Sequence, residues 1–300
     1  MFDDAGPICS TTAPNQYAAL GYLNSSVASY YMGFSGGSTL NYLPGTLLSL
    51  PWIEPDHESE IHSLVDHLIS DSKQDWDAFE TSWDFTQHPL LPETDQHAIL
   101  IKDNYSRWAN ECQERFDALR VNEEELNRIF AKIYNMEGEV PIEIPDEKVG
   151  VRLADKERDI KSLISYGIGC IFGRYSTDKP GLILADQGST VSDFTAKVPN
   201  AAFPIDEDGI LPILDGEWFE DDIVVEFKNW LKAIYGSETL QVNIAFIEDS
   251  LGEDLRTYFV KHFYDDHVKT YQKRPIYWLF SSPKKSFNVL VYLHLSLIHI

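Results

Sequence analysis

The feature that most constrains this chain is residues 95–135, where hydrophobic side chains keep helical spacing and neither glycine nor proline occurs. Such a stretch predicts a long helix. Asn122 followed by Glu125 is typical of a helix N-cap with an acid three residues on, so we expect the helix to restart there. Beyond this point Leu126, Ile129 and Phe130 form its apolar face.

Further stretches carry the same spacing, and short apolar pieces lie between them. Residues 39–43 and 182–184 are expected to be extended, and Pro44 with Gly45 predicts a turn. The fold class is therefore mainly α with α+β portions. Additional helices are expected over 17–32, 55–87, 155–175, 219–235 and 253–272.

One of these helices has an apolar stripe that the sequence extends unusually far. Ile61 and Val65 begin the stripe, and Trp76, Phe79 and Trp83 continue it at similar spacing. The spacing therefore predicts that the helix pattern continues through these aromatic residues, until Pro89 and Pro92 end the segment.

Composition excludes several classes of protein. The 300 residues include 43% hydrophobic and 13% aromatic residues, enough to build a core, which excludes disorder over the whole length. With 24 Lys and Arg against 48 Asp and Glu, the net charge is −24, which excludes a uniformly basic nucleic-acid binder. Three distant cysteines predict no disulfide framework and favour a cytoplasmic location. No signal peptide or membrane span is expected.

Two glycine motifs match catalytic or cofactor patterns only in part. Gly33 to Gly37 has the spacing of a nucleophile elbow, but a helix pattern precedes it instead of a strand, which favours a helix stop. Gly167, Gly169 and Gly173 resemble a dinucleotide loop with the wrong spacing, inside a helix pattern. Their small size favours close helix packing.

Clusters of metal-ligating and acidic residues are also weak signals. His57, His62 and His67 recur every five residues, whereas two histidines of one helical metal site are four apart. Acidic groups at 206–208, 220–222 and 265–266 could serve acid–base or Mg²⁺ chemistry, but helix N-termini and solvation also explain them. Neither a catalytic residue nor a metal site is predicted.

Residues 261–285 depart from the acidic character of the chain. They hold six Lys and Arg against two Asp, and aromatic residues are interleaved with the basic ones. Such a composition suits a surface that contacts phosphates. An ordinary strand and turn, with its bend at residues 281–283, explains it equally well.

The beginning of the chain resembles the end of a target recognition domain. The residues that carry the resemblance are Leu23-Asn-Ser25-Ser-Val27, Thr39-Leu-Asn41, Gly45 and Leu50-Pro51. This pattern is shared by type I specificity subunits and type IIG restriction-modification enzymes.

Four further blocks resemble the C-terminal part of the PglX family, the adenine-specific DNA methyltransferases of BREX phage-defence systems. They extend in order along the chain, over residues 75–85, 122–130, 159–175 and 274–283. The resemblance implies that the full enzyme methylates adenine N6 in double-stranded DNA with S-adenosylmethionine, in concert with other BREX proteins. It also implies that base extrusion precedes the reaction.

The family's Asn-Pro-Pro-Tyr motif and glycine-rich cofactor loop are expected upstream, since neither occurs in this chain. The chain is therefore expected to be a fragment that binds no cofactor and is inactive alone. Within this frame the candidate DNA-contacting residues are Lys273, Arg274, Lys284 and Lys285, and more weakly Ser38, Thr39 and Asn41.

The implied organisation has five parts. The end of the recognition domain is followed by a helical spacer, a linker, a C-terminal α+β region, and a tail that resembles translated adapter sequence. Two alternatives remain open, a DNA-binding module like a type I specificity subunit and a helical scaffold without enzymatic activity. The parts cover residues 1–54, 55–137, 138–150, 151–294 and 295–300.

Overall fold

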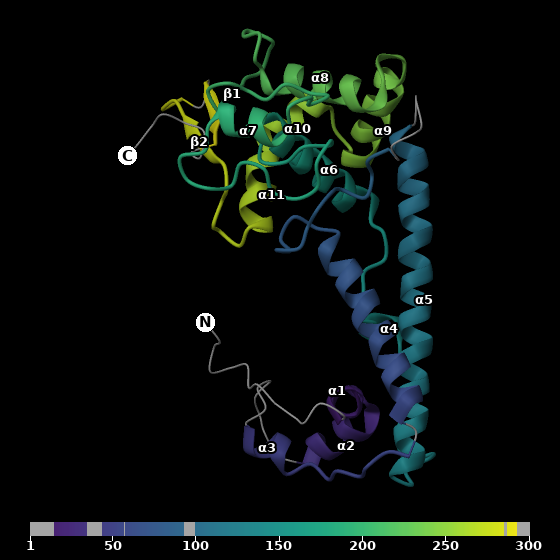
Figure 1. Ribbon diagram of the computed structural model, residues 1–300. Coiled ribbons are helices and arrows are strands. Elements are labelled where there is room, and N and C mark those ends of the chain that lie inside the picture. Colours follow the sequence, from purple (N-terminus) through teal and green to yellow (C-terminus); the bar gives the residue numbers. More distant parts are fainter. Residues whose placement is uncertain (1–14, 35–43, 57, 93–99, 285–286, 293–300) are drawn as a thin grey trace. The chain divides into compact units, whose positions relative to one another are not determined.

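The structure is a computed structural model that describes residues 15–34, 44–56, 58–92, 100–284 and 287–292. Within these ranges it is mainly helical, with eleven α-helices and one small three-stranded antiparallel sheet (Figure 1). The mainly helical prediction is confirmed. None of the helices there combines the length and apolar character needed to cross a membrane.

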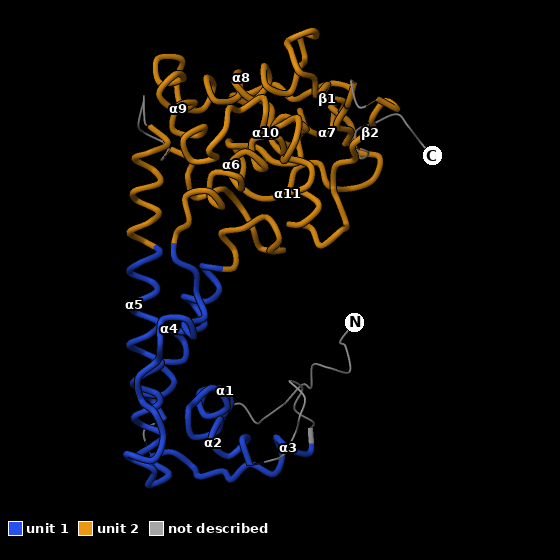
Figure 2. Tube along the Cα trace, turned by 180° about the vertical axis from the view of Figure 1, so that it is seen from behind, with its two compact units in different colours: residues 1–75, 112–153 blue, residues 76–111, 154–300 orange. Residues whose placement is uncertain are grey.

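The chain divides into two compact units (Figure 2). The first unit comprises residues 1–75 and 112–153, and the second comprises residues 76–111 and 154–300. Helix α5, Ile101–Ile133, contributes to both units. It runs without interruption through Asn122, so the restart expected there is wrong. Continuous backbone hydrogen bonding and the packing of its apolar face outweigh the local capping preference of Asn122.

The first unit contains α1 (Gln16–Asn24), α2 (Ser26–Phe34), α3 (Pro44–Leu48) and α4 (Glu58–Asp77). One helix was expected over 17–32, but the chain breaks at Ser25. The Ser25 hydroxyl donates to the Tyr22 carbonyl at 2.7 Å and accepts from the Ala28 N–H at 3.3 Å. Serine thus competes for the backbone groups that a continuous helix would use. The turn expected at Pro44 is instead the first turn of α3, a position where proline is favoured.

The core of the first unit forms where α1 meets α4 and α5. A Cβ atom on Gly21 would lie 3.1 Å from Val65 and 3.3 Å from Phe130, so only glycine allows this approach without a shift. The Tyr22 ring stacks on Tyr134 with centroids 5.1 Å apart. Residues 140–144 pack beside α5, where the Asn127 amide donates to the Ile142 carbonyl at 3.2 Å.

The second unit is built around α6 (Lys156–Ile171), which packs against α8 (Ile223–Tyr235) and α9 (Leu240–Leu251). A Cβ atom on Gly167 would lie 2.7 Å from the Phe227 ring and 3.0 Å from the Trp230 ring. Glycine therefore serves close helix packing, as expected from its position inside the helix pattern. The remaining helices are α7 (Val191–Lys197), α10 (Leu255–Lys261) and α11 (Phe263–Thr270).

The sheet of the second unit has the strand order β1–β3–β2, with both pairs antiparallel. Leu211, Leu290 and Leu279 are in register across the sheet, and the first two are fully buried. No strand forms at 182–184, where Ile183 and Leu184 instead bond back to the carbonyls of residues 174 and 173. The strands are β1 (Ile210–Ile213), β2 (Trp278–Ser281) and β3 (Asn288–Val291).

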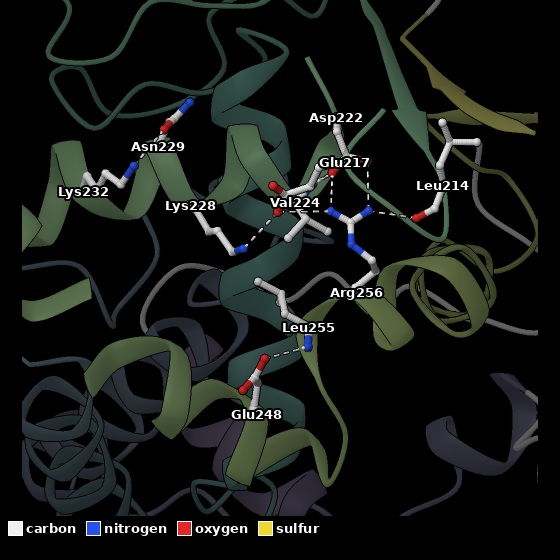
Figure 3. A network of polar contacts seen from close by, with 10 residues as sticks. All are labelled: Leu214, Glu217, Asp222, Val224, Lys228, Asn229, Lys232, Glu248, Leu255 and Arg256. Atoms are coloured by element: carbon white, nitrogen blue, oxygen red, sulfur yellow. Dashed lines mark hydrogen bonds and ion pairs between the residues drawn. The ribbon is translucent and has the colours of Figure 1, made fainter. Parts of the chain in front are cut away.

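Helices α10 and α11 replace the single helix expected over 253–272, with a break at His262. Helix α10 is tied to the start of α8 by Arg256 (Figure 3). Its guanidinium donates to both oxygens of the fully buried Asp222 carboxylate, at 2.9 and 3.0 Å, and to the Leu214 carbonyl at 2.8 Å. Asp222 also caps α8 by accepting from the Val224 N–H at 3.0 Å. The Arg256 guanidinium and the buried Asp222 carboxylate thus find their partners within the fold.

Candidate nucleic-acid interface

The structure describes three of the seven residues expected to contact DNA. Ser38, Thr39, Asn41 and Lys285 lie outside the described residues. Lys273, Arg274 and Lys284 are all exposed.

Lys273 and Arg274 lie in the tight turn that follows α11. The chain reverses there because Gln272 and Lys273 take left-handed backbone conformations, with φ of 51° and 65°. The Lys273 N–H bonds to the Val268 carbonyl at 2.8 Å, and the Arg274 N–H to the Tyr271 carbonyl at 2.9 Å. Left-handed conformations are unfavourable for residues other than glycine, and such strain is found preferentially at functional sites.

The basic residues flank one strand. Lys273 and Arg274 precede β2 in the chain, whereas Lys284 follows it in the turn toward β3. The strand between them exposes Trp278 and Phe280, which point to the same face. The strand and turn expected around residues 281–283 are therefore present.

A cavity of about 450 Å³ opens beside Arg274. Three segments distant in sequence form its walls, namely 80–85, 174–182 and 270–276, all within the second unit. Arg174 and Arg274 line it together with Trp83, whose side chain is 100% exposed. A site of this size suits a small ligand, held by a few placed polar groups.

Glu80 fixes one wall of the cavity. Its carboxylate accepts from the Tyr271 hydroxyl at 2.7 Å and from the Ser165 hydroxyl at 3.0 Å. Burial raises the pKa of Glu80, while these hydrogen bonds and the charge of Arg174 act in the opposite direction. The Glu80 carboxyl therefore joins α6, the turn after α11 and the segment that carries Trp83.

His267 holds the segment that follows Arg274. Its Nε2 atom accepts from the backbone N–H groups of Ile276 and Tyr277, at 3.0 and 3.2 Å. Burial and, to a smaller extent, the positive charge of Arg174 together lower the pKa of His267 to about 4. The ring is thus neutral near pH 7, as an acceptor must be.

The charges at the cavity differ from those in the rest of the described chain. Lys156, Arg158 and Arg256 are among many basic residues whose side chains lie within 4 Å of a carboxylate. Arg174 donates only to the hydroxyls of Tyr175 and Tyr292, at 3.3 and 3.5 Å. Among the described residues, Arg174 and Arg274 form no ion pair. In a chain with a net charge of −24, they place two positive charges beside one buried acidic residue, Glu80, at a single cavity.

Sequence reasoning missed Trp83, Glu80 and Arg174 as parts of a site. Trp83 was assigned to the apolar stripe of a helix, but α4 ends at Asp77 and Trp83 lies in the turns beyond it. Trp76, which continues the same stripe, is 59% exposed, so the extension of the stripe is wrong. A signal was present in the blocks that carry the family resemblance, because three of them supply residues to this cavity.

The other candidate motifs have structural roles where they are described. Gly33 lies in the last turn of α2, which ends at Phe34, and Gly169 lies within α6, where a Cβ atom would be 2.6 Å from the Tyr175 ring. Cys112 and Cys170 are buried, as expected for core cysteines. Over the described ranges, no three His, Cys, Asp or Glu side chains gather in a way that could hold a metal ion.

The acidic group at 206–208 forms a turn. Asp206 accepts from the backbone N–H groups of Gly209 and Ile210, at 2.6 and 3.1 Å. Burial, followed by the nearby charge of Asp208, raises the pKa of Asp206 to about 7. These bonds shape the entry to β1, which explains the carboxylate structurally.

Comparison with known proteins supports a relation to DNA-modifying enzymes. The chain is 39% identical to the adenine-specific methyltransferase PglX of Lacticaseibacillus casei (strain Zhang), over 92% of this chain and 23% of that protein. It is 35% identical to the adenine-specific methyltransferase BrxX of Escherichia coli O9:H4 (strain HS), over 93% of this chain and 25% of that protein. No family model matches the chain. The chain is thus homologous to these methyltransferases and spans about a quarter of their length.

Proposed function

We propose, from its homology to PglX and BrxX, that this chain is the C-terminal part of an adenine-N6 DNA methyltransferase of a BREX phage-defence system. In this proposal it contributes DNA contacts and a helical scaffold, and the reaction takes place elsewhere in the full-length enzyme. The homology over more than nine tenths of the chain is the observation that supports the assignment.

The cofactor S-adenosylmethionine supplies the methyl group in such an enzyme. The residues of this chain do not fit a site for it, because the glycine-rich cofactor loop does not occur in the sequence, and the catalytic Asn-Pro-Pro-Tyr motif is absent as well. The chain's own residues therefore act on DNA binding, and we assign no chemical step to them.

The part of this chain proposed to meet DNA is the basic set Lys273, Arg274, Lys284 and Lys285. The described members are exposed and form no ion pair within the described residues, so their charges are free to meet phosphates. Phosphate contacts position a protein on the duplex without distinguishing sequence. Residues 1–54 are proposed as the end of the target recognition domain, with Ser38, Thr39 and Asn41 as secondary candidates. Cytoplasmic location and other BREX proteins as partners belong to the same proposal.

The remaining boundaries are part of the same proposal. Residues 55–137 form the helical spacer, 138–150 the linker, 151–294 the C-terminal region, and 295–300 a non-native tail.

Charge reversal in the full-length enzyme tests the proposal. Replacing Lys273, Arg274, Lys284 and Lys285 by Glu is expected to weaken duplex binding and to reduce the slope of log affinity against log salt by about 3 to 4. Methyl transfer at limiting DNA should fall in parallel. The measurement is a salt titration of binding, followed by methylation of the same duplex.

A matched variant controls for the change in net charge. The same reversal at four exposed lysines elsewhere should leave the salt slope unchanged, and these are Lys102, Lys132, Lys148 and Lys232. Equal losses in the two variants would show that only overall charge matters. An unchanged affinity in the first variant would refute DNA contact by the basic set.

A further inference from the structure

We propose that the cavity beside Trp83 binds a nucleotide unit, with its phosphate at Arg274 and Arg174 and its base stacked on the Trp83 indole. This inference goes beyond the proposed duplex contact, because it assigns a class of ligand to the cavity. Among the described members of the basic set, Arg274 alone lines this cavity.

The phosphate component follows from the two arginines. Guanidinium groups bind phosphate oxygens through paired N–H donors and stay charged at any physiological pH. The Arg174 guanidinium donates hydrogen bonds to the hydroxyls of Tyr175 and Tyr292, at 3.3 and 3.5 Å. These bonds orient the planar guanidinium in the cavity wall. Both arginines line the same cavity and neither forms an ion pair in the described part of the chain. Glu80, the acidic residue of the wall, is buried and bonded to Tyr271 and Ser165, so the two guanidinium groups remain available to an anion.

The base component follows from Trp83. Its indole is 100% exposed although it belongs to a well-bonded turn. The Ser82 N–H bonds to the Phe79 carbonyl at 2.9 Å, and the Asp84 N–H bonds to the Ser82 hydroxyl at 3.1 Å. The backbone thus holds the large aromatic ring in water beside the arginines. Exposed aromatic rings next to positive charge are stacking platforms for bases.

The walls of the cavity are built by the fold, not by loosely held loops. The Glu80 carboxylate ties Tyr271 to Ser165, and the Phe85 ring meets Tyr175 with centroids 5.4 Å apart. The site is therefore shaped before a ligand arrives, which lowers the entropy cost of binding. An anion and a planar ring in one small site describe a nucleotide, either free or as one unit of a single strand.

Calorimetric titration of the 300-residue chain tests the proposal. The probes are deoxynucleoside 5′-monophosphates, the matching deoxynucleosides, inorganic phosphate, and a four-nucleotide single strand. We expect the monophosphate to bind about 10-fold more tightly than the nucleoside or inorganic phosphate, because only it uses both parts of the site. Comparison of the single strand with the monophosphate identifies the source of the nucleotide.

Two variants separate the parts of the site. Trp83→Ala should weaken monophosphate binding about 10-fold, and Arg274→Gln should weaken the monophosphate but not the nucleoside. The controls are Trp218→Ala, at another tryptophan that is 75% exposed, and Lys232→Gln, at an exposed cation outside the basic set. Neither control should change binding. Because all four side chains are exposed, the variants should keep the unfolding temperature of the parent chain.

Three results would overturn the proposal: no nucleotide binding, equal affinity for phosphate and monophosphate, or equal losses in Trp83→Ala and Trp218→Ala. The first of these would leave the duplex proposal standing. That proposal is tested by charge reversal of the basic set, of which Lys273 and Lys284 do not line the cavity.

Discussion

Arg256 and Arg274 belong to the same compact unit and differ in what surrounds them. Arg256 is turned toward a fully buried carboxylate and a carbonyl, and all of its partners belong to the fold. Arg274 is exposed at the edge of a cavity that it shares with Arg174, and neither forms an ion pair within the described residues. The first arrangement is closed, and the second is open to a partner from outside.

This difference distinguishes polar side chains that stabilise the fold from polar side chains that are available to a ligand. A buried ion pair persists only where every donor and acceptor is satisfied, since an unpaired buried charge is strongly destabilising. An exposed arginine adds little to stability. Its place beside a cavity and an exposed indole is therefore better explained by a ligand than by the fold.

The largest expected effect is at the closed arrangement. Arg256→Ala leaves the Asp222 carboxylate buried without its partner, so we expect the free energy of unfolding to fall by about 3–5 kcal/mol. Arg274→Ala should change it by less than about 0.5 kcal/mol. Urea unfolding of both variants measures the contrast. Similar losses at the two positions would remove the distinction between closed and open arrangements.

The next effect concerns the segment that carries Arg274 into β2. His267 is neutral in the fold, with a pKa of about 4, whereas in the unfolded chain it takes up a proton near pH 6.5. The contribution of His267 to the free energy of unfolding is therefore complete above pH 6.5. It is lost as the pH falls toward 4, by about 1.4 kcal/mol per pH unit.

The comparison with His267→Gln isolates this residue, since glutamine does not titrate. Urea unfolding at pH 6.5, 5.5 and 4.5 should show a steeper loss for the parent chain than for the variant. Identical pH slopes would mean that His267 is not buried and neutral as described. His88, whose pKa is also lowered by burial, is present in both proteins and cancels.

The smallest effect is in the strained turn. Lys273→Gly relieves a left-handed conformation and should raise the free energy of unfolding by about 0.5–1 kcal/mol. It should also reduce the salt slope of duplex binding in the full-length enzyme by about 1. Gln272→Gly is the control, because it shares the conformation but carries no charge. If both variants altered the salt slope alike, turn geometry and not the lysine charge would be responsible.

Much of the helical part of the fold was predictable, because helical spacing is a local property. Helix α6 begins at Lys156, next to its expected start at residue 155, and α8 has the expected buried residues Phe227, Trp230 and Leu231. The errors lie where a side chain forms contacts that the spacing does not show. Ser25 divides a helix through its own hydroxyl, and Asn122 lies within a helix held by its neighbours.

The candidate site was predictable only in part. The basic, aromatic character of residues 261–285 drew attention to Arg274. Nothing in the spacing indicated that Lys284 would lie at the other end of a strand, or that Tyr277 would be buried in the core. Trp83 fitted the spacing of an apolar stripe, because the sequence shows that the residue is hydrophobic. The sequence does not show that its side chain is exposed to solvent.

By itself, the sequence determined that this protein is mainly helical, that its charge excludes a uniformly basic binder, and that it is related to adenine-specific methyltransferases. Periodicity and residue blocks are properties of short segments, and composition and net charge are sums over the whole chain. Only the tertiary structure decided that Trp83, Arg174 and Arg274 line one cavity, and that Arg256 is enclosed while Arg274 is not. These outcomes depend on contacts between segments far apart in the chain, which no local pattern specifies.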